Sequence, residues 1–188
     1  SRALRGATNV TEETRIKVQR AADQLNFTLS KSASALASGK TMRVILLVSG
    51  KLNEWFNSGV LQGVYEELAP VGYDVTPAFI TDRSELDRFF SQLPKSRNAD
   101  AIIISSFQLM PAMRDQLQAI DLPTVGVNVP AESGYFDASI SIDNSSAMTM
   151  AVRLLRSLGH TNIAFCSDYI PADMVYNTSQ RTQAFADA

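Results

Sequence analysis

The side chains that most often carry out catalysis or bind metals are scarce in this chain. Its 188 residues include one histidine, His160, and one cysteine, Cys166, so an intrachain disulfide is excluded and a zinc site is disfavoured. His160 lies in a Leu-Gly-His-Thr stretch typical of a turn after a helix, and no serine–histidine or paired-carboxylate arrangement stands out. The loop Ser49–Asn53 matches neither a dinucleotide motif nor a P-loop. We therefore expect no enzyme activity, no metal and no cofactor.

The side chains that could act as a group are the basic residues near the start. Residues 1–43 carry eight basic and three acidic side chains, a net charge of +5. The remainder carries nine basic and sixteen acidic side chains, a net charge of −7. Such a segment is typical of nucleic-acid binding, because counterions released from phosphates favour basic contacts at low salt. A solvated basic helix without a partner is the open alternative.

Two short helices are predicted in the basic segment. Residues 1–6 are typical of a helix end stopped by Gly6, and Thr11 is the predicted N-cap of a second helix. The second helix is predicted to carry an apolar stripe, Thr14, Val18, Ala21 and Leu25, opposite a basic face, Arg15, Lys17 and Arg20. This arrangement resembles the second half of a helix-turn-helix unit.

Residues 30–39 form a segment rich in alanine and serine that ends in Gly39 and has one large apolar residue, Leu36. A helix this short is marginal in water because nucleation is costly. Two interpretations therefore stay open: a flexible linker, or a segment that becomes helical when a partner orders it.

The rest of the chain alternates apolar runs with helical patterns. Arg43–Val48 is a continuous apolar run, typical of a strand buried on both faces. Further strands are predicted at 73–80, 101–105 and 123–127, with helices at 57–69, 84–93 and 111–120. This alternation predicts an α/β fold with a doubly wound parallel sheet. Pro77 places the second strand at an edge, as in the strand order 2-1-3-4-5.

The last fifty residues continue the alternation. An alternating run at 138–142 predicts a strand, followed by a helix at 145–158, a left-handed Gly159, a strand at 162–166 and a helical stretch at 179–188. The chain starts at Ser1 rather than methionine and stops within a helical pattern, so we expect a fragment. It has no bilayer-length apolar run and no charged-then-apolar leader, so we expect a cytoplasmic protein with no membrane partner.

Three motifs, taken together and in order, resemble the LacI/GalR family of bacterial transcriptional regulators. They are VTEETR at 10–15 with Ala22 and LNF at 25–27, ASALASG at 33–39, and IDN at 142–144 with the leucine-rich stretch through LGH to Phe165. The resemblance implies a partial helix-turn-helix headpiece in residues 1–29 and a hinge helix and linker in 30–42. It further implies the N-terminal lobe of a periplasmic-binding-protein-like core in 43–143 and the start of its C-terminal lobe in 144–188.

The resemblance also assigns site residues. The implied DNA-binding residues are Ser1, Arg2, Arg5, Asn9, Lys31, Ser32, Ala33, Leu36 and Ala37, with Leu36 wedging into a minor-groove step. The implied effector-binding residues are Trp55, Phe56, Asn57, Ser106, Asn128, Asp143 and Arg181. They are expected between two lobes at the carboxyl ends of the strands. Core packing is the alternative for the two aromatic residues, and a surface ion pair is the alternative for Arg181.

The function implied by the resemblance is sequence-specific regulation of transcription. We expect a repressor that binds double-stranded operator DNA as a homodimer and responds to a small-molecule effector, expected to be a carbohydrate. One alternative is a periplasmic-type sugar-binding protein, which the missing leader and the basic segment disfavour. The other is a sugar-processing enzyme, which the missing nucleophile and base disfavour.

Overall fold

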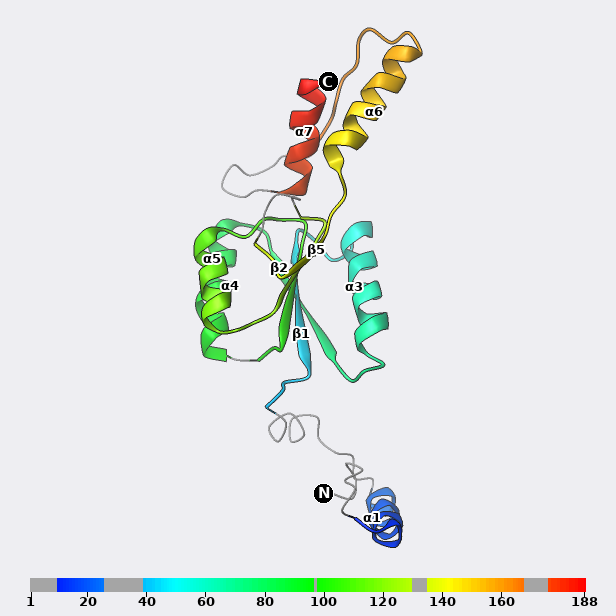
Figure 1. Cartoon of the computed structure of the whole chain (residues 1–188), viewed down its shortest axis with the longest axis vertical. Coiled ribbons are helices and arrows are strands. Elements are labelled where there is room, and N and C mark those ends of the chain that lie inside the picture. Colours follow the sequence, from blue (N-terminus) through cyan, green and yellow to red (C-terminus); the bar gives the residue numbers. More distant parts are fainter. Residues whose placement is uncertain (1–9, 26–38, 97, 130–134, 168–175) are drawn as a thin grey trace. The chain divides into compact units, whose positions relative to one another are not determined.

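The structure is a computed structural model of the chain, and it describes residues 10–25, 39–96, 98–129, 135–167 and 176–188 (Figure 1). The chain divides into two units, Ser1–Thr41 and Met42–Ala188, and each is described by itself. All nine expected DNA-binding residues lie outside the described residues: Ser1, Arg2, Arg5, Asn9, Lys31, Ser32, Ala33, Leu36 and Ala37. The predicted helix end at 1–6 and nearly all of the segment at 30–39 lie outside them too.

The described part of the first unit is the helix α1, Glu12–Gln24. Thr11 caps it as predicted, because its hydroxyl accepts a bond from the Thr14 backbone N–H at 3.4 Å. Within α1, Ala22 is buried and Leu25 is 77% exposed. The Thr14 hydroxyl is bonded to the Thr11 hydroxyl at 2.8 Å. The predicted apolar stripe stays a prediction, because the neighbouring segments of this unit lie outside the described residues.

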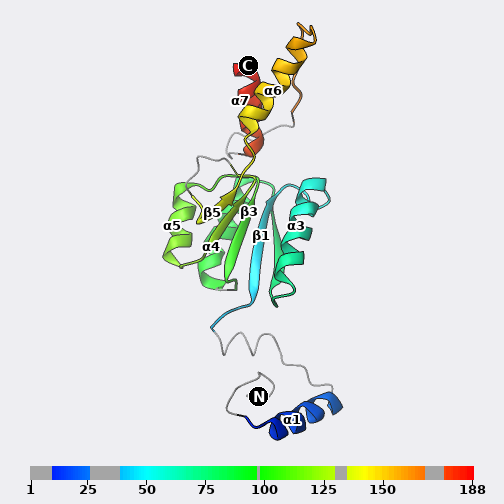
Figure 2. The ribbon, with the colours of Figure 1, turned by 45° about the vertical axis from the view of Figure 1, so that its right-hand side comes forward.

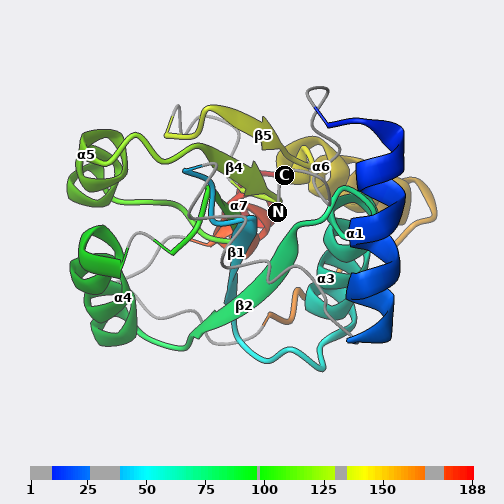
Figure 3. The same ribbon diagram turned by 90° about the horizontal axis from the view of Figure 1, so that it is seen from below.

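The second unit is built on five parallel strands in the order β2-β1-β3-β4-β5. Their bounds are β1 Arg43–Ser49, β2 Asp74–Ile80, β3 Ala101–Ser105, β4 Thr124–Val127 and β5 Ala138–Ile140. The helices between them are α3 Trp55–Leu68, α4 Arg83–Ser96 and α5 Pro111–Ala119. Figure 3 shows the sheet between α3 on one side and α4 with α5 on the other. The doubly wound parallel sheet and its strand order are confirmed.

The core follows from the two-residue period of the central strands. Ile45 and Leu47 of β1 pack in one cluster with Ile102 and Ile104 of β3 and with large side chains of α4 and α5, including Phe90. The intervening residues of β1 point to the opposite face and are also buried. Each fully buried aliphatic side chain contributes about 1.5–3 kcal/mol relative to an exposed one. This core fixes the strand ends at which the loops begin.

The two edge strands behave differently from the centre. Pro77 lies in β2, at an edge as predicted, where the missing backbone N–H costs no ladder bond. At the other edge, β5 is exposed throughout and Ile140 is 71% exposed. The strand predicted at 138–142 is thus present over Ala138–Ile140, and it pairs in the sheet with β4 alone.

Two further helices follow the sheet, α6 Asn144–Ser157 and α7 Asn177–Asp187, and they lie side by side (Figure 2). Gly159 ends α6 in the predicted left-handed conformation, with φ +88°. The strand predicted at 162–166 is wrong: these residues belong to no strand, and the sheet of the described residues does not include them. Phe165 stacks instead on Phe185 of α7, with ring centroids 5.4 Å apart. No helix in the described ranges is both long and apolar enough to cross a bilayer.

Candidate functional site

The polar side chains of the second unit gather at the carboxyl edge of the sheet. Ser106 and Asn128 directly follow β3 and β4, and both have left-handed backbones, with φ +73° and φ +54°. Left-handed residues other than glycine are uncommon and concentrate at functional sites. At this edge the Ser106 N–H donates to the carbonyl of Val127 at 2.9 Å, which ties the two strand ends together.

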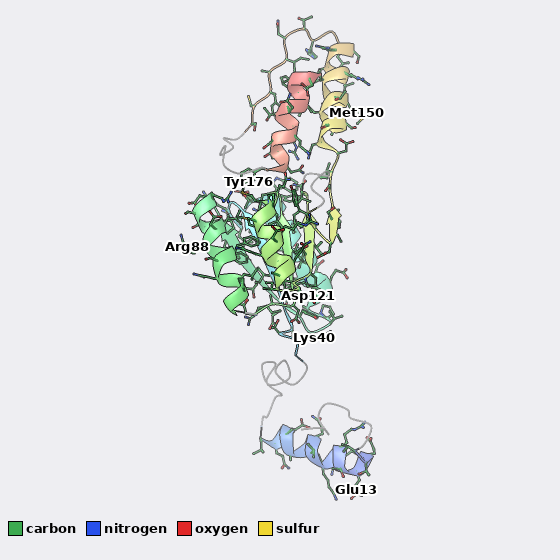
Figure 4. All side chains as sticks on the ribbon, turned by 60° about the vertical axis from the view of Figure 1, so that its left-hand side comes forward. Glu13, Lys40, Arg88, Asp121, Met150 and Tyr176 are labelled. Carbon is green, nitrogen blue, oxygen red and sulfur yellow. The ribbon has the colours of Figure 1, made fainter. Side chains whose placement is uncertain are left out.

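Hydrogen bonds join these strand ends to the start of α7. The Asn128 Nδ2 donates to the Ser106 hydroxyl at 3.3 Å, and the Asn177 Nδ2 donates to the Asn128 Oδ1. The Asn177 backbone N–H donates to the Ser106 carbonyl at 3.2 Å. Tyr176, labelled in Figure 4, forms an antiparallel bridge with Phe107 just beside them. The first turn of α7 is thereby anchored to the edge of the sheet.

Asn177 is a site residue that the sequence analysis missed. Its side chain is 1% exposed, and its Oδ1 has no hydrogen-bond partner among the described residues. A buried acceptor without a partner is costly and is usually satisfied by a ligand or a water molecule. The signal available in the sequence was its position four residues before Arg181, which puts both on one face of a helix.

Arg181 reaches back from α7 to the start of α6. Its Nε donates to the Oδ1 of Asn144 at 2.7 Å. The ion pair considered as the alternative is not formed with the described residues, because the partner is a neutral amide. Asn144, also missed from the sequence, is 3% exposed, and its Nδ2 has no partner in the described parts of the chain.

Asp143 has a task that the sequence did not predict: it is the N-cap of α6. Its carboxylate accepts from the Ser146 backbone N–H at 2.9 Å and from the Ser146 hydroxyl at 2.7 Å. These bonds, the backbone one first, lower the pKa of Asp143 from its ordinary value. The carboxylate therefore holds the start of the helix that carries Asn144.

The first turn of α3, just after the loop that follows β1, presents the two predicted aromatic residues. Trp55 is 85% exposed, so core packing does not apply to it, and Phe56 is half-buried. Their rings meet edge to face with centroids 5.6 Å apart. Asn57 faces inward instead, and its Nδ2 donates to the carbonyls of Ser49 and Lys51 at 2.8 and 3.0 Å. The structure gives Asn57 the task of holding this loop.

Five of the seven predicted site residues thus fall into two bonded groups and an aromatic pair. Asn57 and Asp143 instead hold the loop after β1 and the start of α6. Ser106 and Asn128 are bonded together with Asn177, and Arg181 is bonded to Asn144. Within the described residues, no hydrogen bond or ring contact links Trp55 or Phe56 to either group. The bonded groups offer amide, hydroxyl and guanidinium contacts, which suit a polar, hydroxyl-rich ligand. No cluster of metal-ligating side chains occurs in the described ranges.

Curated proteins similar to this chain are transcriptional regulators, and no protein-family model matches it. The HTH-type transcriptional regulator AglR of Rhizobium meliloti (strain 1021) is 27% identical over 96% of the chain and 51% of its own length. The HTH-type transcriptional repressor PurR of Vibrio cholerae serotype O1 (strain M66-2) is 30% identical over 85% of the chain and 47% of its own length. The chain therefore spans about half the length of the curated relatives it matches.

Solved structures with the same fold are repressors and regulators as well. The lac repressor dimer bound to operator and the anti-inducer ONPF has a TM-score of 0.79 at 19% identity, covering 99% of this chain and 55% of that one. A complex of the transcriptional regulator CelR with cellobiose has a TM-score of 0.62 at 25% identity, covering 100% of this chain and 55% of that one. The fold resembles the regulator core in both cases.

Proposed function

We propose that the chain is part of a LacI/GalR-type transcriptional regulator, a DNA-binding repressor controlled by a small effector. The observation that carries the proposal is the polar edge of the sheet, where Ser106 and Asn128 are bonded to Asn177 of α7. Doubly wound sheets bind ligands at this edge. A ligand there would contact the strand ends and the helices that follow them at once.

We propose that the effector is a carbohydrate. The available groups, the Arg181 guanidinium, the amides of Asn128 and Asn177 and the Ser106 hydroxyl, match the donors and acceptors of sugar hydroxyls. The exposed Trp55 provides a flat apolar surface on which the face of a sugar ring could stack. Among the similar structures, CelR is solved with cellobiose and a LacI-family regulator of Lactobacillus casei with sucrose.

DNA binding is assigned to the basic segment. In α1 two basic side chains are paired within the helix, Arg15 with Glu12 at 3.5 Å and Lys17 with Glu13 at 2.7 Å. Exposed pairs of this kind contribute little energy and leave less net charge for phosphates. We therefore propose that the contacts to duplex operator DNA come from the residues outside the described ranges, with Leu36 in the minor groove.

We propose that the protein works as a homodimer that uses the α3–β2 face. A groove of about 380 Å³ lies beside α3 and the edge strand β2. Most of its lining side chains are apolar, and the full lining is Leu52, Ser58, Leu61, Gln62, Tyr65, Val75 and Pro77. Large exposed apolar side chains mark interaction sites, and Tyr65 on this face is 59% exposed. The similar lac repressor structure is a dimer.

The proposal is tested on the full-length protein with fluorescently labelled DNA from its own upstream region. Anisotropy should show specific binding, and one member of a panel of cellobiose, sucrose, glucose and ribose should shift the affinity. The relatives are regulators rather than enzymes, so none of these sugars should be consumed during the measurement. Sugar turnover, or sugar binding without any binding to DNA, would favour the enzyme or the binding-protein alternative.

A further inference from the structure

Asn144 is a buried asparagine with an unusual balance of partners. Its Oδ1 accepts from the Arg181 Nε at 2.7 Å, whereas its Nδ2 is buried and has no partner among the described residues. The oxygen and nitrogen of an asparagine amide can often be exchanged without breaking a hydrogen bond. Here it cannot, because the guanidinium only donates and so must face the oxygen. The side chain is therefore fixed in one orientation by Arg181.

The bond also fixes Arg181 in return. An arginine side chain has several rotatable bonds, and ordering it costs up to about 2 kcal/mol of rotamer entropy. The bond to Asn144 orders it through Nε, and the two Nη groups make no hydrogen bond with the described residues. A guanidinium held through Nε presents both Nη groups in one plane, ready for a bidentate contact.

Asn144 is itself held in place by what precedes it. It is the first residue of α6, and its backbone N–H donates to the carbonyl of Ile142 at 2.9 Å. The preceding residue, Asp143, accepts two bonds from Ser146. The amide thus projects from a capped helix start, which is a rigid support for a neighbouring side chain.

We infer that Asn144 is a positioning residue that orients Arg181 for the effector, and this inference rests on the proposed function of the site. Its neutral amide holds the guanidinium without neutralising it, whereas a carboxylate at this position would form an ion pair. The full positive charge and both Nη groups of Arg181 remain for the ligand.

The first experiment needs no effector and follows the Arg181 Nε–H by nuclear magnetic resonance in full-length protein with isotope-labelled arginine. Asn144→Ala should speed the hydrogen exchange of this group by about tenfold or more, because the protecting acceptor is gone. Asn144→Asp keeps an oxygen acceptor and should restore slow exchange. Ser145→Ala, at the exposed neighbouring position on α6, is the matched control and should leave it unchanged. Fast exchange in wild type, or no change in Asn144→Ala, overturns the inference.

The second experiment measures binding of cellobiose, sucrose, glucose and ribose by calorimetry to wild type, Asn144→Ala, Arg181→Ala and the double variant. If Asn144 acts through Arg181, Asn144→Ala should lower the affinity for the sugar about tenfold when Arg181 is present. The same substitution should lower it little further in protein that already carries Arg181→Ala. Additive losses overturn the positioning role and leave Asn144 a separate contact. If no sugar binds while the exchange result holds, the carbohydrate proposal fails and the ordering of Arg181 by Asn144 stands.

Discussion

Arg181 is the side chain on which the proposed effector site depends most. It is the charged member of the described site residues on α7, and it is half-buried. We expect Arg181→Ala to lower the affinity for the effector by roughly tenfold or more, because a hydrogen bond to a charged group contributes about 1.5–3 kcal/mol. DNA binding without effector should persist. Calorimetry and DNA anisotropy on the full-length protein measure the two effects.

The matched control for Arg181→Ala is Arg153→Ala, an exposed arginine on α6. It removes the same charge from the second unit and should leave effector affinity near wild type, since exposed charges act weakly. If Arg181→Ala and wild type bind the sugar with equal affinity, Arg181 does not contribute to effector binding and its role is structural.

Leu36 is the residue on which DNA specificity should depend. It is the large apolar side chain in an alanine- and serine-rich segment. We expect Leu36→Ala to weaken specific operator binding far more than non-specific binding, because a minor-groove wedge affects the bend and makes little phosphate contact. Anisotropy with operator and with scrambled DNA at one salt concentration compares the two. A parallel loss on both DNAs would mark Leu36 as a linker residue.

At this scale the sequence predicted some site residues and missed others for a physical reason. Ser106, Asn128 and Arg181 were assigned from their places in a resemblance, and the structure puts them at the carboxyl edge or on α7. Asn144 and Asn177 were missed because asparagine is common at turns and helix starts, so its type carries little information. What distinguishes them is burial beside residues 37 and 49 positions away, and this arises only in the folded chain.

The start of α6 is the element whose stability should depend on pH. Bonds from Ser146 lower the pKa of Asp143. A carboxyl group whose pKa is lowered in the folded state stabilises the fold at pH values above its ordinary pKa. This stabilisation is lost as the pH falls through the lowered pKa. Asp143→Asn should therefore lower the thermal unfolding midpoint near neutral pH, and the difference from wild type should shrink as the pH falls below the ordinary Asp pKa. Thermal scans of both proteins across that range test it.

A neighbouring change separates capping from a general loss of charge. Asp187→Asn, at the far end of α7, removes the same charge from an exposed side chain that does not cap the start of a helix. Its midpoint should follow the wild type at every pH. If the unfolding midpoints of Asp143→Asn and wild type differ by the same amount at every pH, the ionised carboxylate has no stabilising role.

The strands of the sheet were predicted well, and the strand expected at 162–166 was not. The run Arg43–Val48 became the inner strand β1, because its apolar side chains are covered on both faces of the sheet. Residues 162–166 carry similar β-branched and aromatic side chains yet form no strand, because ladder bonds need a neighbouring strand. Strand propensity depends on neighbours that a single segment cannot specify.

The charge division of the whole molecule predicts how it binds DNA. Residues 1–43 carry a net charge of +5 and the rest −7. Binding should weaken steeply as salt rises, since phosphate contacts release counterions. Deleting residues 1–43 from the full-length protein should abolish binding while circular dichroism shows a folded body. DNA binding that is independent of salt, or that survives the deletion, would refute this assignment.

The assembly of the molecule is predicted to depend on the α3–β2 face. Tyr65 lies on the rim of its groove and is exposed in a single copy. Tyr65→Glu would place a carboxylate in an apolar contact, where an unpaired charge is costly, so we expect the full-length dimer to dissociate. Sedimentation should show a monomer, and circular dichroism should show the wild-type fold. Gln118→Glu, an exposed site on α5 across the sheet, adds the same charge and should remain dimeric.

Because a dimeric repressor contacts two operator half-sites, the monomeric variant should also bind operator more weakly without losing its affinity for the effector. A Tyr65→Glu protein that sediments as a wild-type dimer would place the interface on another face.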